Sequence, residues 1–237
     1  MQARRPPRGS WGAEMHVCRV PVIAFFAFIA IVALWLGVSG SAMAQVRGGT
    51  AVIVVQADPG HLSPAISTGS HVHAVADSLY NALVELDRDL RPQPDLAQRW
   101  TVSERGTVYT FQLMPNVKWH DGTPFTSADV KFTFDEVLLK HHARTKAGIG
   151  AVIAAIETPA PDTVVFSLKK PYGALLQLLN VTEAPILPRH LYQGSDPLTN
   201  PVNLKPVGTG PFKLESYRTD QQVVMVRNPD YFKAGLP

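Results

Sequence analysis

The sequence VKWHDGTPFTSADVKFTFDEVLL, residues 117–139, is the stretch from which the rest of the chain is interpreted. Large apolar side chains alternate over residues 117–119, as in a strand, and His120-Asp121-Gly122 then favours a turn. Thr126 and Asp129 have the spacing of a capping box. Apolar residues with helical spacing follow: Val130, Phe134, Val137 and Leu138. The stretch therefore predicts a strand, a polar turn and a capped amphipathic helix.

His120 and Asp121 carry side chains that acid–base catalysis uses. The sequence places no nucleophile beside them, so we interpret the pair as part of the turn. The chain has no G-x-S-x-G elbow, no G-x-x-x-x-G-K-[ST] loop and no H-E-x-x-H motif. Gly208-Thr209-Gly210 is too short for a dinucleotide loop and is followed by Pro211, so it predicts a turn. No enzyme is predicted.

Residues 1–44 have the composition of a targeting segment. Four arginines precede the uncharged stretch Val20–Val38, and small residues then end in Ala42-Met43-Ala44. This pattern predicts a signal peptide over residues 1–44 and release of the remaining chain to the periplasm. The alternative is an uncleaved membrane anchor, because the uncharged stretch approaches the roughly 20 residues that span a bilayer. Met15 is an alternative start.

The net charge of +3 belongs to this leader, which holds four Arg and one Glu. The rest of the chain is neutral, so no basic surface of the kind that binds nucleic acid is predicted. The single cysteine, Cys18, also lies in the leader. Disulfide bonds, thiol catalysis and cysteine-based zinc sites are therefore excluded for residues 45–237.

The remaining segments predict a mixed α/β (α+β) class with hairpins and a parallel component. Ala51–Gln56 is a short apolar run between turn signals and predicts a buried strand. Helical segments are expected at Val72–Val84, Asp95–Trp100, Pro171–Leu179 and Pro188–Tyr192. Strands are expected at Thr107–Leu113, Ile153–Glu157, Thr163–Leu168, Phe212–Tyr217 and Gln222–Arg227. The last four strands predict two hairpins, the first with a five-residue loop.

Histidines are the candidate metal ligands. His71 and His73 point the same way only if their segment is extended, and the adjacent His141 and His142 diverge. A metal site normally takes three or four protein ligands in a defined geometry. We therefore predict no metal site and no cofactor. His71 and His73 remain candidates for lining a ligand cleft, and a plain polar loop is the alternative.

Seven ordered blocks resemble bacterial extracellular solute-binding proteins of family 5, the oligopeptide, dipeptide and nickel-type receptors of ABC importers. KWHDGTPFTSADV, residues 118–130, resembles the signature V-K-F/W-H-D-G-x-P-h-x-A-x-D-V. The other blocks are GGT (48–50) with DPGHLSP (58–64), LYNALV (79–84), PDLAQRW (94–100), YTFQL (109–113), PVGTGPF (206–212) and RNPDY (227–231).

The resemblance implies a lobe of the class II periplasmic-binding-protein type. Residues 45–237 would form the first lobe, and the second lobe is expected to be missing from this chain. Within the first lobe, residues 46–79 and 184–237 would form an incomplete main subdomain, and residues 80–183 a small subdomain. Because one wall of the cleft would be absent, we expect weak ligand binding or none by the chain alone.

The resemblance also implies a function. It is that of an exported, non-enzymatic substrate-binding component of an ABC importer, which captures peptides in an inter-lobe cleft and delivers them to the permease subunits. A receptor for nickel, a metal chelate or another small solute is the alternative within the family. An exported hydrolase or metalloenzyme is the alternative from another class.

Matched positions imply where a ligand would touch this lobe. Ser67–His73 and Thr182-Glu183 fall on family segments that line the cleft. The candidate ligand-binding residues are Thr68, Ser70, His71, His73 and Glu183. A solvated loop is the competing interpretation for each. Because Thr68 and Gly69 stand where many members carry bulkier residues, the resemblance implies no specific ligand.

Overall fold

The computed structural model describes residues 48–233, 235 and 236. The predicted signal peptide lies outside these residues, so the structure does not test it. The helices and strands named in this section belong to the unit that begins at Ile53. In the described part of the chain, no helix combines the length and the apolar character needed to cross a bilayer.

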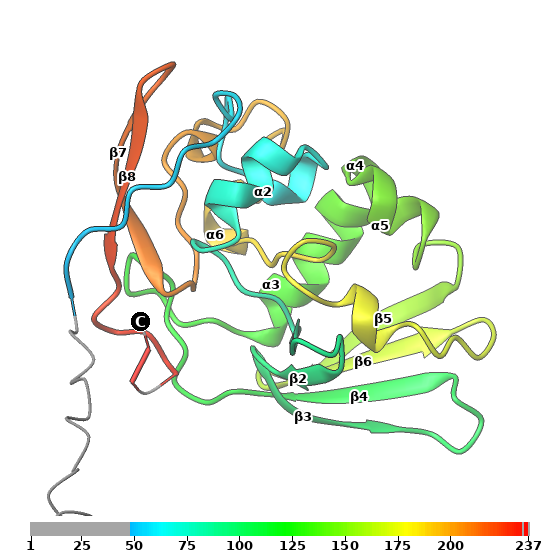
Figure 1. Ribbon diagram of the computed structural model, residues 1–237. Helices are drawn as coiled ribbons and strands as arrows, with labels where there is room; N and C mark the ends of the chain where they lie inside the picture. Colours follow the sequence, from blue (N-terminus) through cyan, green and yellow to red (C-terminus); the bar gives the residue numbers. More distant parts are fainter. Residues whose placement is uncertain (1–47, 234, 237) are drawn as a thin grey trace, which may run out of the picture. The chain divides into compact units, whose positions relative to one another are not determined.

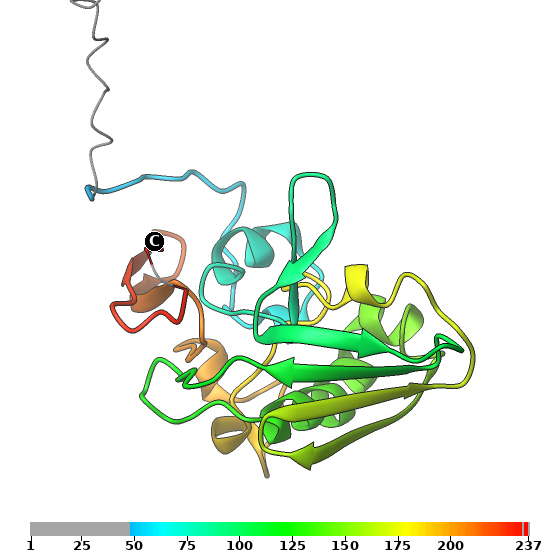
Figure 2. The ribbon, with the colours of Figure 1, turned by 90° about the horizontal axis from the view of Figure 1, so that it is seen from below.

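A four-stranded antiparallel sheet forms the framework of this unit. Its order is β3 (Ala97–Val102), β4 (Val108–Leu113), β6 (Thr163–Leu168) and β5 (Ile153–Ala160). Buried and partly exposed residues alternate along β4 and β6, so one face of each strand belongs to the core. Figure 2 shows this sheet with the helices lying behind it.

The predicted amphipathic helix is confirmed, and it covers the inner face of the sheet (Figure 1). It comprises α3 (Ser127–Phe132), a π-helical segment η2 (Thr133–Leu138) and α4 (Leu139–His141). The capping box is present, and the four residues of the predicted apolar stripe are fully buried. The ring of Phe134 meets Phe166 of β6 edge-on at a centroid distance of 5.0 Å.

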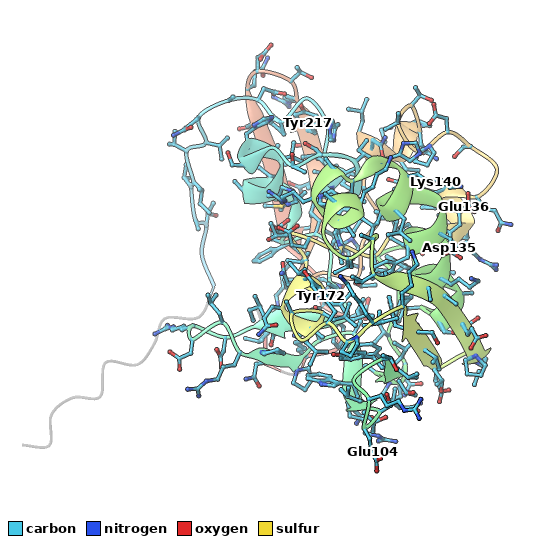
Figure 3. The ribbon with its side chains drawn as sticks, turned by 90° about the vertical axis from the view of Figure 1, so that its right-hand side faces the viewer. Glu104, Asp135, Glu136, Lys140, Tyr172 and Tyr217 are labelled. Carbon is cyan, nitrogen blue, oxygen red and sulfur yellow. The ribbon has the colours of Figure 1, made fainter. Side chains whose placement is uncertain are left out.

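The outer side of the same helix carries charged pairs. Lys131 Nζ lies 2.6 Å from Asp135 Oδ2, and Lys140 Nζ lies 2.5 Å from Glu136 Oε2. Figure 3 labels Asp135, Glu136 and Lys140 along this side. Exposed pairs at this spacing stabilise a helix by only a few tenths of a kcal/mol, roughly 0.3–0.5 each. The apolar stripe is therefore what attaches the helix to the sheet.

Several short elements complete the unit. The predicted hairpin near the C-terminal end is confirmed as β7 (Phe212–Arg218) with β8 (Gln222–Arg227), and the predicted turn of helix before it as α6 (Arg189–Tyr192). The others are η1 (Pro64–Ile66), α2 (Ser70–Ala76), β1 (Val84–Leu86), β2 (Pro92–Pro94), α5 (Ala143–Ala147), η3 (Leu176–Leu178) and η4 (Pro201–Asn203).

The prediction of a buried strand at Ala51–Gln56 is wrong. The segment belongs to no strand, and Val52, Ile53 and Val54 are 77–93% exposed. A run of β-branched residues becomes a buried strand only where another strand pairs with it and side chains cover it. Among the described residues no strand pairs with this run, and the sequence pattern could not supply that information.

The helical predictions were wrong in segments whose backbone conformation is set by contacts with distant residues. Asp95–Trp100 was predicted to be a helical turn, but β3 begins at Ala97 and pairs with β4. Of the helix predicted at Val72–Val84, only α2 forms, and β1 begins at Val84. Of the helix predicted at Pro171–Leu179, only the short 3₁₀ turn η3 forms, and Leu175 and Leu179 flank it. Apolar spacing alone does not distinguish a helix from a buried irregular segment.

Two further differences concern strand pairing. The β5–β6 hairpin is confirmed, but its strands extend to Ala160 and Thr163, so Pro161-Asp162 replaces the predicted five-residue loop. The expected parallel component is not found in the described part of the chain, where every named strand pair is antiparallel. The mixed α/β class is confirmed.

Candidate functional site

The side chain of Arg144, in α5, connects the two segments that were predicted to line a ligand cleft. Its Nε lies 3.1 Å from Oε1 of Glu183. One Nη atom donates to the carbonyl of Thr182 at 3.2 Å, and the other lies 3.5 Å from the carbonyl of Thr68. A guanidinium suits such a fork, because its five N–H donors diverge from one rigid plane. Arg144 therefore fastens both segments to one helix.

A second connection runs through the side chain of His73 in α2. Its Nδ1 lies 2.8 Å from Oδ1 of Asp77, one helical turn further on, and its Nε2 lies 2.9 Å from the carbonyl oxygen of Ser67. The other carboxylate oxygen of Asp77 accepts from the hydroxyl of Thr182 at 2.8 Å. A continuous series of polar contacts thus joins residue 67, α2 and the 182–183 segment.

His142 closes the buried side of this network. Its fully buried ring meets that of His73 edge-on at 6.4 Å between centroids. Burial, together with the positive charge of Arg144, lowers the pKa of His142 to about 4. The imidazole of His142 is therefore neutral at pH 7. The hydroxyl of Thr145 contacts its Nδ1 and also donates to the carbonyl of Glu183.

A pocket of about 380 Å³ adjoins the network, and Asp77 and Thr182 form part of its wall. Asp95, also in the wall, is buried, accepts from Nδ2 of Asn81 at 2.9 Å and lies 2.8 Å from Nζ of Lys233. This ion pair ties the end of the described chain to the pocket. We call the surface formed by residues 67–71, Asp77 and residues 182–183 the candidate ligand face.

The structure places all five predicted site residues on or directly beneath this face. Thr68 and Ser70 are exposed, and Ser70 begins α2. His71 is half-buried, with its ring folded over Gly69. Glu183 is paired with Arg144 as described. His73 differs from the others, because it is only 7% exposed and both of its ring nitrogens have partners within the protein.

Sequence reasoning missed two residues of the network, Arg144 and Asp77. Asp77 could have been found, because it lies four residues after His73 and such pairs meet on one face of a helix. The sequence pattern instead led to a pairing of His73 with His71 in an extended segment. Arg144 lies in a polar segment with no local motif. Its contacts are with residues 38 and 76 positions away, so no sequence signal indicated them.

His120 and Asp121, the pair with side chains suited to catalysis, hold two turns together. Nε2 of His120 donates to the carbonyl of Gly210, and its Nδ1 accepts from the N–H of Gly208, both at 3.1 Å. The carboxylate of Asp121 accepts from the N–H of Thr123 at 2.9 Å and contacts Nε2 of His190 at 2.7 Å. The turn interpretation of both sequence blocks is therefore confirmed.

This arrangement predicts a loss of stability in acid. Burial lowers the pKa of His120 to about 4, and protonated Nδ1 would direct an N–H against the N–H of Gly208. The neutral ring of His120 stabilises the folded chain fully above the unfolded-state pKa near 6.5. As the pH falls toward 4, this contribution to the free energy of unfolding is lost, by roughly 3 kcal/mol. Urea unfolding at pH 7 and pH 4 should show that the free energy of unfolding decreases less for His120→Gln than for the wild type. Equal decreases would mean that His120 is not held neutral by these contacts.

Neither a metal site nor the second hollow in the structure is a better candidate for the functional site. Among the described residues, no three His, Cys, Asp or Glu side chains are placed to hold a metal ion. A larger hollow of about 550 Å³ lies beside the outer side of α3 and α4 and contains none of the predicted site residues. Its lysines, Lys131 and Lys140, are already paired with carboxylates.

The sequence of this chain matches a known protein family. Residues 91–237 match the family described as bacterial extracellular solute-binding proteins, family 5 Middle. The chain belongs to this family. The family 5 match covers the four-stranded sheet, the capped helix, Arg144 and residues 182–183. The Thr68–His73 part of the candidate ligand face precedes the matched region.

Relatives within family 5 bind different solutes. A candidate ABC transporter peptide-binding protein of Brucella ovis is 38% identical over 183 residues, which are 75% of this chain and 34% of the relative. The glutathione-binding protein GsiB of Salmonella typhi is 32% identical over 209 residues, 87% of this chain and 40% of GsiB. The structure of NikZ from Campylobacter jejuni in complex with Ni(L-His) has a TM-score of 0.62 at 30% identity, covering 73% of this chain and 34% of NikZ.

The chain thus spans between a third and two fifths of the length of these relatives. The comparisons support the prediction of a solute-binding protein of mixed α/β fold. The name of the Brucella ovis relative describes a peptide-binding protein of an ABC transporter, the name of GsiB describes a glutathione-binding protein, and NikZ was crystallised with a nickel–histidine complex.

Proposed function

We propose that this chain is part of the substrate-binding component of an ABC importer and that it contacts peptides through the candidate ligand face. The observation that carries the proposal is the Arg144 fork, which joins exposed Thr68 to the 182–183 segment, and Thr182 of that segment lines a pocket. Loops fixed on a rigid scaffold are common ligand-contacting elements. No catalytic role is assigned to any residue.

The ligand class rests on the relatives. The Brucella ovis relative carries a peptide-binding name, and GsiB carries a glutathione-binding one. Both exceed 30% identity over most of this chain. A nickel–histidine complex remains the second candidate, because NikZ shares the fold and the candidate ligand face contains His71. Thr68, Ser70, His71, His73 and Glu183 stay the proposed site residues.

The proposal also includes export, delivery of ligand to a permease, a division into two subdomains and closure on the ligand. Export to the periplasm rests on the leader pattern of residues 1–44, and delivery to permease subunits rests on family membership. The division into a main subdomain (46–79 and 184–237) and a small subdomain (80–183) is supported by the four-stranded sheet, which is built entirely from residues 97–168. Ligand would be held by closure of two lobes about a hinge.

An NMR titration of the ¹⁵N-labelled chain tests this proposal, because chemical shifts also report weak binding. A mixed pool of di- to pentapeptides should move the amide signals of Thr68, Ser70, His71 and Glu183. The β7–β8 hairpin should not respond. Ni(L-His), added separately, tests the second candidate. If the probes move signals elsewhere in the chain but not these, or if the peptides are hydrolysed, the proposal is wrong.

A matched pair of variants separates ligand contact from general charge. Glu183→Ala should reduce the peptide-induced shifts, because it removes a carboxylate of the candidate ligand face. Glu157→Ala, on the exposed side of β5, should leave them unchanged. Equal effects of the two changes would argue against a site at Glu183.

A further inference from the structure

The ring of His73 is bounded by hydrogen-bond acceptors on both sides. Its Nδ1 faces the carboxylate of Asp77 at 2.8 Å, and its Nε2 faces the backbone carbonyl of Ser67 at 2.9 Å. A carbonyl oxygen can only accept, and an ionised carboxylate can only accept. The Asp77 carboxylate is further committed as an acceptor, because the hydroxyl of Thr182 donates to its second oxygen.

A neutral imidazole cannot satisfy both of these partners. It carries one N–H, so one ring nitrogen would direct a lone pair at an oxygen lone pair. Only the imidazolium form donates from both nitrogens. Because the side chain is 7% exposed, water has little room to replace a lost contact, and an unsatisfied buried group is costly.

The charged groups around His73 come from three elements. Asp77 caps the end of α2, the neutral His142 caps the start of α5, which carries Arg144, and Glu183 lies opposite Arg144. The positive charge of Arg144 is offset by Glu183 at 3.1 Å, whereas Asp77 contacts the ring directly. Burial lowers the pKa of His73, but the hydrogen bond and charge of Asp77, with the carbonyl of Ser67, raise it above its ordinary value overall.

We propose that His73 is a positioning residue whose imidazolium form holds the Ser67–Ser70 segment in place and whose deprotonation releases that segment. Only the description of this segment as part of a ligand site rests on the proposed function. Protonated His73 ties the carbonyl of Ser67 to α2. A neutral His73 has one N–H and can keep only one of its two contacts. The carboxylate of Asp77 is the stronger partner, so the N–H stays with Asp77 and the contact with Ser67 is lost.

The direction of the pH effect follows from this geometry. The segment is held below the ordinary histidine pKa, and it is freed as the pH rises through the raised pKa of His73. If the held segment is the binding-competent one, one pH unit above the midpoint leaves about a tenth of the molecules competent. The apparent affinity for ligand should then be roughly tenfold weaker.

The test is an NMR titration of the full chain between pH 6 and pH 10. Ring ¹⁵N shifts should show both nitrogens of His73 protonated at pH 6, below the ordinary histidine pKa. The amide signals of Thr68, Gly69 and Ser70 should move, and their hydrogen exchange should accelerate, with the same midpoint. Asp77→Asn should lower that midpoint, whereas Asp89→Asn, at an exposed carboxylate outside the network, should leave it unchanged. A neutral His73 at pH 6, or segment amides that do not follow His73, would overturn the proposal.

A peptide arm separates this inference from the proposed function. The same peptide pool is titrated at pH 6 and one pH unit above the His73 midpoint. Binding that weakens roughly tenfold supports both ideas. If the segment follows His73 but peptide shifts are absent or independent of pH, the positioning role stands and the location of the ligand site is wrong. If His73 is neutral at pH 6, the positioning role fails whatever the peptide does.

Discussion

Gly208→Ala should destabilise this chain at least as much as the loss of a fully buried aromatic ring. A Cβ atom at residue 208 would lie 1.7 Å from the carbonyl oxygen of Leu79 and 2.7 Å from its carbonyl carbon. Both are backbone atoms, so no side-chain rotation can relieve the overlap. We expect the free energy of unfolding to fall by more than about 4 kcal/mol, which is exceptional for one methyl group.

The backbone on either side cannot easily move away. The N–H of Gly208 donates to Nδ1 of His120 at 3.1 Å, and its carbonyl accepts from the N–H of His120 at 2.8 Å. The N–H of Gly210 donates to the carbonyl of Leu79 at 3.0 Å. Separating the turn from Leu79 would therefore break hydrogen bonds that buried backbone groups require.

Urea unfolding followed by circular dichroism measures this effect. Gly173→Ala is the matched control, because a Cβ there meets nothing within 4 Å and the backbone is not in the left-handed region. That variant should stay within about 0.5 kcal/mol of the wild type. If Gly208→Ala behaved like Gly173→Ala, the close approach of the 208–210 turn to Leu79 would be wrong.

Local chemistry accounts for what could be predicted from the sequence. The capped helix at 127–139 depends on neighbours within one or two turns, so Thr126, Asp129 and the apolar stripe could be identified directly. The two hairpins were likewise predicted, because each is closed by a short turn. The first hairpin still extends further than expected, since strand length depends on cross-strand pairing.

Contacts between residues far apart in the sequence account for the features that could not be predicted. Ala51–Gln56 has a strand-like composition, but composition does not say whether a partner strand is present. Asp95 begins the predicted helical turn, but its carboxylate accepts from the N–H of Ala82 and from Asn81, and the residues from Ala97 onward pair with β4. The candidate ligand face shows the same limit. Its exposed members were proposed by resemblance to a family, whereas Arg144, which holds them together, is recognisable only in three dimensions.

Phe134→Ala should cost about 3–5 kcal/mol of unfolding free energy, as expected for removing a fully buried ring. Phe134 is 0% exposed and lies in the π-helical segment η2. It contacts Phe166, which in turn meets Phe111 of β4 edge-on at 5.6 Å. Removing this ring therefore opens a cavity between the helix and the central strands, and the rigid sheet cannot collapse to fill it.

Phe132→Ala, at the end of α3, provides the comparison for this prediction. Phe132 is only partly buried, and it packs at the edge of the core, so its loss should cost clearly less. Urea unfolding of both variants beside the wild type measures the difference. Equal costs would mean that η2 does not direct Phe134 into the core.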